Sequence, residues 1–200
     1  MTILIIISLV LGSIGSGLGI YLTIVKIKDQ YQKPELEIKG IDEKIFNAAE
    51  SDDKPEKLIK VSRILIENKK KKKAKDCVGV LFIEKRPETE KDILEKKVPL
   101  HWADTNPSSL VCSTKPITVT NVLPRPLDVV FTKDKGKYKG AWIASHFALK
   151  NPKIGNNQFR LVPGEYKVTI KVDCSNGKGD EKKYMIISPE KWDDLEIKEI

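Results

Sequence analysis

The chain opens with an apolar stretch, residues 1–25, that contains no charged side chain; the first one after it is Lys26. The hydrocarbon core of a bilayer is crossed by about 20 mostly apolar helical residues. Only helices and closed barrels cross it, because exposed backbone groups find no water partners there. The stretch therefore predicts a transmembrane helix over 1–25, followed by a juxtamembrane helix extension or linker over 26–34. Pro34 should end that extension, because it disfavours a helical conformation at the preceding residue.

The charges beside this stretch bear on its orientation. No basic segment precedes it, as one would in a secretory signal peptide, whereas Lys26, Lys28 and Lys33 follow it and are opposed only by Asp29. Positive charge next to a membrane-spanning helix tends to stay in the cytoplasm. The sequence thus predicts a single-pass protein of the cell membrane with an uncleaved anchor, and the charge difference favours a cytoplasmic soluble domain over an extracellular one.

Four small residues fall along one face of the predicted helix, namely Gly12, Gly15, Ser16 and Gly19. The spacing of Gly12 from Ser16, and of Gly15 from Gly19, matches the small-xxx-small pattern by which membrane helices pack closely. This pattern predicts a homo-oligomer formed through the helix. The alternative is that glycine and serine are simply common in membrane helices.

The remainder of the chain consists mostly of short β-favouring runs separated by Gly, Pro, Asn and Lys clusters. In the clearest run, Tyr166, Val168, Ile170 and Val172 alternate with polar residues, so one face should be buried and the register firmly set. Residues 77–84 are apolar on both faces, which predicts a strand covered on both sides. The expected strands are 35–40, 58–67, 77–84, 100–103, 110–113, 117–122, 127–132, 141–147, 165–173 and 183–187.

This number of strands is typical of a β-sandwich, which has about seven to nine. We therefore predict a mainly β domain over 35–188, with a short helical or loop insertion near 41–52. The tail, 189–200, should hold a short helix, because Ser188 can cap it and Pro189 suits its first position.

Lysine dominates the charge, with 36 Lys and Arg against 28 Asp and Glu and a net charge of +8. Five adjacent lysines, Lys69, Lys70, Lys71, Lys72 and Lys73, repel one another, so we expect them in a solvated hairpin turn. Their functional alternative is contact with anionic lipid, worth about 1 kcal/mol per lysine near such a surface. Because aromatic residues do not interleave with the basic runs, a nucleic-acid partner is not expected.

Two segments carry a resemblance to a known family. The phrase VSRILIENKKKKKAKDCVGVLFIE, residues 61–84, and PGEYKVTIKV, residues 163–172, resemble the strand-turn-strand and late strand of prokaryotic immunoglobulin-like domains of the cell-adhesion-related type. LHWAD, PLDVVF and the tail SPEKWDDLEI are similar to prokaryotic membrane-anchored proteins. The resemblance implies an immunoglobulin-like β-sandwich used for binding or assembly, and it supplies no catalytic residue. Such domains are often displayed outside the cell, so the opposite orientation stays open.

The most distinctive side chains are His101, Trp102 and Asp104, which would offer a flat face with polar tips at a loop. They form the candidate interaction site, the alternative being that Trp102 plugs one end of the sandwich. Cys77 and Cys174 are a possible disulfide if the domain faces an oxidising compartment. Otherwise they are small buried apolar residues.

These features together predict a membrane-anchored, non-enzymatic module that binds or assembles with an unknown protein partner and needs no cofactor. One alternative is a surface-displayed adhesion or ligand-binding domain. Another is a membrane-tethered hydrolase or metal enzyme, which would gather His101, His146 or a cysteine in a pocket. The sequence contains no Walker loop, GxGxxG or HExxH motif to support that enzyme.

Overall fold

The computed structural model describes residues 19–28, 31–48, 57–87, 97–103, 116–134, 140–144 and 159–200. The chain divides into two compact units, Met1–Lys33 and Pro34–Ile200. We call them the N-terminal unit and the β unit.

The N-terminal unit shows a helix over residues 19–28. Residues 1–18 of the predicted span lie outside the described part of the chain. Among the described residues, no helix combines the length and the apolar character needed to cross a membrane. The predicted transmembrane helix over 1–25, and with it the single-pass location in the cell membrane, is therefore wrong. Of the predicted extension over 26–34, residues 26–28 continue the described helix.

The small residues of the predicted helix-packing face fall largely outside this description. Gly12, Gly15 and Ser16 lie outside the described residues. At Gly19, an added Cβ would meet nothing within 4 Å.

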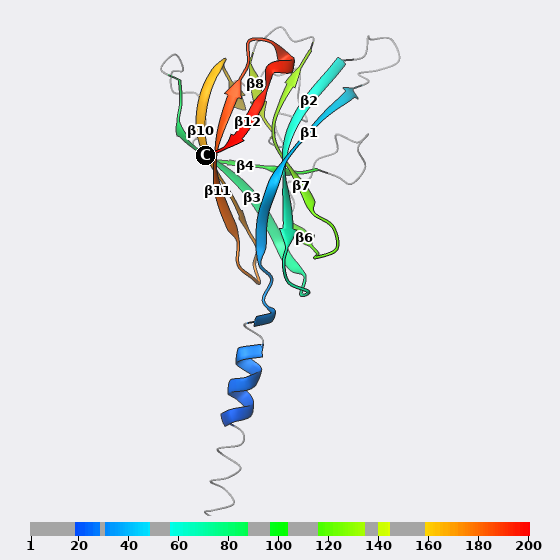
Figure 1. The fold of residues 1–200 in the computed structure, drawn as a ribbon, viewed down its shortest axis with the longest axis vertical. Helices are drawn as coiled ribbons and strands as arrows, with labels where there is room; N and C mark the ends of the chain where they lie inside the picture. The colour runs from blue at the N-terminus through cyan, green and yellow to red at the C-terminus, as the bar shows by residue number, and fades with distance from the viewer. Residues whose placement is uncertain are drawn as a thin grey trace, which may run out of the picture. The chain divides into compact units, whose positions relative to one another are not determined.

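The β unit consists of two antiparallel sheets of six strands each (Figure 1). The first sheet has the order β1 (Leu36–Ala48), β2 (Lys57–Asn68), β7 (Arg125–Lys133), β8 (Ala141–Ile143), β9 (Arg160–Leu161), and β5 (His101–Trp102) also pairs with β7. The second has the order β12 (Glu196–Glu199), β11 (Asp180–Ser188), β10 (Gly164–Asp173), β3 (Ala74–Lys85), β4 (Lys97–Pro99), and β6 (Ile117–Val119) also pairs with β3. The predicted mainly β architecture is confirmed, and the two sheets are compatible with a β-sandwich.

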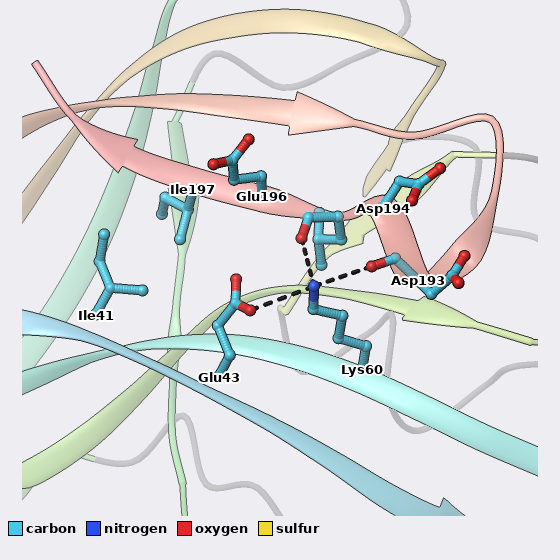
Figure 2. A pocket seen from close by; sticks show the side chains of 8 residues that line it. Ile41, Glu43, Lys60, Asp193, Asp194, Glu196 and Ile197 are labelled. Carbon is cyan, nitrogen blue, oxygen red and sulfur yellow. Dashed lines mark hydrogen bonds and ion pairs between the residues drawn. The ribbon is translucent and has the colours of Figure 1, made fainter.

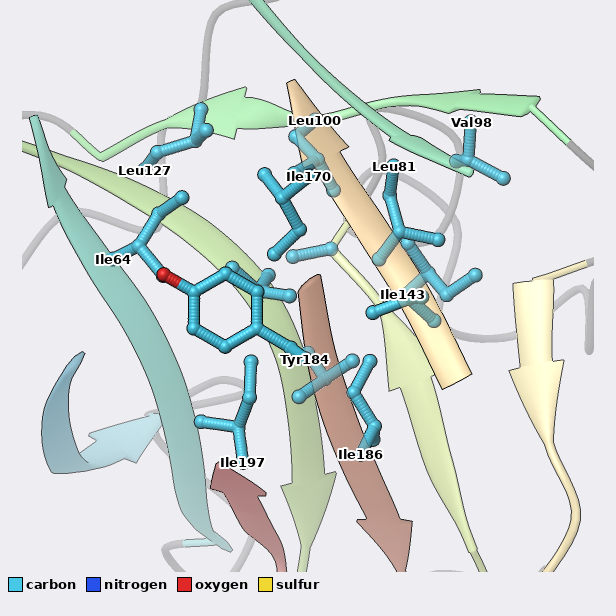
Figure 3. Close-up of a cluster of buried hydrophobic side chains, with 14 of the residues drawn as sticks. Ile64, Leu81, Val98, Leu100, Leu127, Ile143, Ile170, Tyr184, Ile186 and Ile197 are labelled. Atoms are coloured by element: carbon cyan, nitrogen blue, oxygen red, sulfur yellow. The ribbon is translucent and has the colours of Figure 1, made fainter. Parts of the chain in front are cut away.

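Apolar side chains from both sheets form one core (Figure 3). Ile64 and Leu127 of the first sheet are fully buried, as are Leu81 and Ile170 of the second. The sheets are in close contact at Gly79 on β3, where an added Cβ would collide with Cδ2 of Leu127 and lie 2.8 Å from its Cδ1. A side chain at position 79 would therefore collide with the opposite sheet.

The predicted alternation along residues 165–173 is confirmed. Tyr166, Val168, Ile170 and Val172 are all buried, while the residues between them are half-buried or exposed. The strand predicted over residues 77–84 forms within β3, but its burial alternates along the strand, so only one of its faces is covered. The prediction that both faces are covered is wrong.

Two further predictions need correction. The insertion near 41–52 is not a helix or loop up to residue 48, because β1 continues through Ala48 and pairs with β2 as far as Lys57; residues 49–52 lie outside the described part. The tail holds only a short 3-10 helix, η2 (Trp192–Asp194), followed by β12, so the sheets extend beyond the predicted boundary at residue 188.

Ser188 has a different role from the predicted helix cap. Its hydroxyl donates to the backbone oxygen of Leu161 at 2.8 Å and accepts from the backbone N–H of Ala141 at 2.9 Å. The side chain thereby connects the end of β11 to β8 and β9, and so joins the two sheets. The predicted strand over 110–113 lies outside the described residues.

Candidate interaction groove

β1 and β12 are the end strands of the two sheets, so each has one edge that is not paired with another described strand. On the side of β1 that faces away from β2, the backbone N–H groups of Leu36 and Ile38 donate to the Lys178 oxygen at 2.9 Å and to the Asp180 carboxylate at 2.8 Å. Beyond Gly40, the described residues pair β1 with β2 alone. The backbone of residues 41–48 is therefore an open edge, which is the usual template for pairing with another strand.

A groove of about 630 Å³ lies between this edge and the segment formed by η2 and β12 (Figure 2). We call it the edge groove. Its apolar lining comes from Ile41, Leu195 and Ile197, of which only Ile41 is exposed. The complete lining is Ile41, Glu43, Lys60, Asp193, Asp194, Leu195, Glu196 and Ile197.

Lys60 connects the two walls of the groove through hydrogen bonds and an ion pair. Its ammonium donates to the backbone oxygens of Leu195 at 2.7 Å and Asp193 at 3.0 Å, and it lies 3.2 Å from the Glu43 carboxylate. An ammonium has three N–H donors, so all of them are used. Lys60 is thus a link between β2 and the η2–β12 segment, and it is not available to hold an anionic ligand.

The remaining charges of the groove are acidic. The exposed carboxylates of Asp193 and Asp194 form no ion pair within the described part of the chain. Glu43 is paired with Lys60, and Glu196 lies 2.9 Å from the Lys198 ammonium. The groove is therefore negative although the chain carries +8 overall, and such a surface complements a cationic partner.

The candidate interaction site at His101 and Trp102 lies elsewhere, and it is buried. The chain crosses from the second sheet to the first between β4 and β5, where the N–H of Leu100 donates to the Gly79 oxygen at 2.8 Å. His101 and Trp102 are 0% and 4% exposed, and the indole N–H of Trp102 donates to the Cys77 oxygen at 3.1 Å. Their burial does not fit a surface that contacts a partner. Asp104 lies outside the described residues.

His101 belongs to a row of buried polar residues across the first sheet. Arg63 on β2 lies opposite Asp128 on β7, which in turn lies opposite His101 on β5. Nε of Arg63 donates to Oδ1 of Asp128 at 2.5 Å, and both side chains are buried. Removing one member of such a pair leaves a buried charge uncompensated, so Arg63 and Asp128 depend on each other.

The two described cysteines are free thiols, so the structure does not contain the disulfide that the sequence left possible. They nevertheless lie near neighbouring strands: Cys77 is on β3, and Cys174 directly follows β10, whose last residue, Asp173, is opposite Val78. Burial raises the pKa of Cys77 to about 11, and it also raises the pKa of the half-buried Cys174. Neither thiol is activated as a nucleophile, since reactivity follows the thiolate.

The five lysines form the predicted hairpin turn between β2 and β3. Asn68 shapes the turn by donating to the Lys72 backbone oxygen at 2.8 Å and accepting from the Lys70 N–H at 3.1 Å. The ammonium of Lys69 lies 2.7 Å from the Glu37 carboxylate, and that of Lys70 lies 3.7 Å from the Glu35 carboxylate. Glu37 on β1, and Glu35 just before it, thus pair with the first two lysines of the turn.

The metal-enzyme alternative required several ligating side chains close together. Within the described ranges, no three His, Cys, Asp or Glu side chains are grouped so that they could hold a metal ion. His146 lies outside those ranges.

Comparison of the chain with protein-family models, curated proteins and solved structures returned no match. The assignment of a function therefore depends on the geometry of the β unit.

Proposed function

We propose that this chain is a non-enzymatic protein-interaction module that takes an extended segment of a partner protein along the edge groove. The observation that carries the proposal is the open edge of β1 next to a groove with apolar and acidic lining. Addition of a strand to an exposed edge uses backbone hydrogen bonds for affinity and pockets for alternate side chains for specificity.

The strand order supports the finer assignment to an immunoglobulin-like sandwich. β1, β2 and β7 are neighbours in one sheet, and β3, β10 and β11 are neighbours in the other. The chain therefore changes sheets between β2 and β3 and returns later to complete both, as in Greek-key sandwiches of the immunoglobulin type. Domains with this architecture commonly bind partners through their edges and loops.

The acidic lining indicates the chemistry of the partner segment. Asp193 and Asp194 have no ion-pair partner in the described part of the chain, and Ile41 offers an exposed aliphatic surface beside them. An extended segment that alternates basic and aliphatic side chains would pair with the carboxylates and cover Ile41. Such complementarity increases specificity and association rate.

Site-specific photo-crosslinking tests this function. A photoreactive residue replaces Ile41 in the groove, and in the control it replaces Val78 on the outer face of β3; both positions are 36% exposed. We expect a discrete crosslinked partner from position 41 that is absent from position 78 and is lost when Asp193→Lys and Asp194→Lys are added. Equal crosslinking at both positions, or a partner that is indifferent to the two charge reversals, would contradict the proposal.

A further inference from the structure

One end of the β unit brings together turns that are far apart in the sequence. Asn68 precedes the lysine turn, and its amide group donates to the backbone oxygens of Lys72 at 2.8 Å and Val119 at 3.4 Å. Val119 also lies opposite Ala74, the first residue after that turn. The segment 120–124, which connects β6 to β7, therefore begins directly beside the five lysines.

The charge at this end is concentrated on the later lysines of the turn. Lys69 and Lys70 are balanced by Glu37 and Glu35. Lys71 and Lys73 are exposed, and their ammonium groups form no ion pair with any described residue. These two side chains are therefore available to an anionic partner.

Two aliphatic side chains accompany them. Val122 and Leu123 are 78% and 70% exposed, more than any other large apolar side chain in the described part of the β unit. They are adjacent in the segment 120–124, so both lie at the same end of the β unit as the lysine turn. Burying such side chains would be favourable, and contiguous exposed apolar surface marks a contact site more often than single exposed residues do.

We propose that this end of the β unit, which we call the basic tip (Lys69–Lys73 with Val122 and Leu123), docks on an anionic lipid surface. Lys71 and Lys73 contact the headgroups, and Val122 and Leu123 insert between them. Peripheral binding of this kind combines electrostatic attraction with shallow burial of apolar side chains, and it requires no segment that crosses the bilayer. The aliphatic pair favours lipid over nucleic acid, because single-strand binding surfaces stack bases on aromatic rings.

Vesicle sedimentation of the full chain tests the proposal, with phosphatidylcholine vesicles that either contain or lack phosphatidylserine. The readout is the ratio of the two affinities, which removes any binding that does not depend on lipid charge. We expect Lys71→Gln with Lys73→Gln to lower this ratio about thirty-fold, since each lysine near such a surface contributes a factor of about five. Val122→Ser with Leu123→Ser should weaken binding to the anionic vesicles about tenfold or more.

Matched controls sit at the other end of the β unit. Ile45→Ser changes an exposed apolar residue on β1, and Lys191→Gln changes an exposed lysine beside η2. Both should leave the ratio unchanged. If the tip variants bind anionic vesicles as well as the parent does, or if the controls lose as much binding, the basic tip is not a lipid-docking site. Loss of DNA retention without loss of vesicle binding in the lysine variants would also overturn the proposal.

Discussion

Replacing Lys60 with methionine should open the edge groove and destabilise the β unit. The change keeps most of the aliphatic stem but removes the ammonium that holds the Leu195 and Asp193 oxygens and the Glu43 carboxylate. Each hydrogen bond from a charged donor contributes about 1.5–3 kcal/mol. Removing the ammonium also removes the cost of keeping a mostly buried charge away from water, and this offsets part of the loss. The Lys60 side chain is 14% exposed, so we expect a net loss of about 2–3 kcal/mol.

Lys44→Met is the matched control for this change. Lys44 lies on β1, is half-exposed, and its ammonium is 3.7 Å from the Asp42 carboxylate. A surface ion pair of this kind contributes less than about 1 kcal/mol. Urea unfolding followed by tryptophan fluorescence gives both free energies of unfolding. If Lys60→Met and Lys44→Met lower the free energy of unfolding equally, Lys60 does not link the two walls of the groove.

Three other substitutions test the interior. Gly79→Ala should lower the free energy of unfolding by about 1–3 kcal/mol, because the new methyl would lie 2.8 Å from Cδ1 of Leu127. When Leu127→Ala is present in the same chain, Gly79→Ala should cost less. If urea unfolding shows that the two effects simply add, the two side chains do not collide. Asp128→Ala should cost about 3–5 kcal/mol by leaving Arg63 buried without its partner, and adding Arg63→Met should recover part of that loss in the same measurement. Because burial raises the pKa of Cys77 from its ordinary 9.0 to about 11, the unfolded thiol loses its proton first as the pH rises. The contribution of the Cys77 thiol to stability should therefore be fully present below pH 9. The free energy of unfolding should fall by about 2–3 kcal/mol between pH 9 and pH 11. Thermal melts of the parent and Cys77→Ala should diverge over that range; parallel curves would exclude the thiol as the cause.

Regular alternation made some of the strands predictable from sequence. In β10, four buried side chains alternate with polar ones, which leaves only one register that avoids burying lysine. In β1, the same period of two is present at Ile41, Glu43 and Ile45, but one member is charged and both isoleucines are exposed. This part of the edge strand covers little of the core, so its pattern is weak and predicts an insertion instead of a strand.

The groove itself could not be predicted, because its two walls come from segments that lie far apart in the amino-acid sequence. Lys60 and its acceptor at Leu195 are separated by 135 positions, and no local pattern joins them. The burial of His101 and Trp102 could not be predicted for a similar reason. The crossing between the sheets at Leu100 places both side chains in the interior, and only the paired strands reveal that crossing.

Amide hydrogen exchange of the chain tests the open edge of β1 most directly. Alternate amides of residues 41–48 should exchange rapidly, because β2 satisfies only one side of β1 in the described structure. Amides of β2, β3, β7 and β10, which have a strand on each side, should be strongly protected. If every amide of residues 41–48 were as protected as those central strands, the edge would already be paired and could not receive a partner segment.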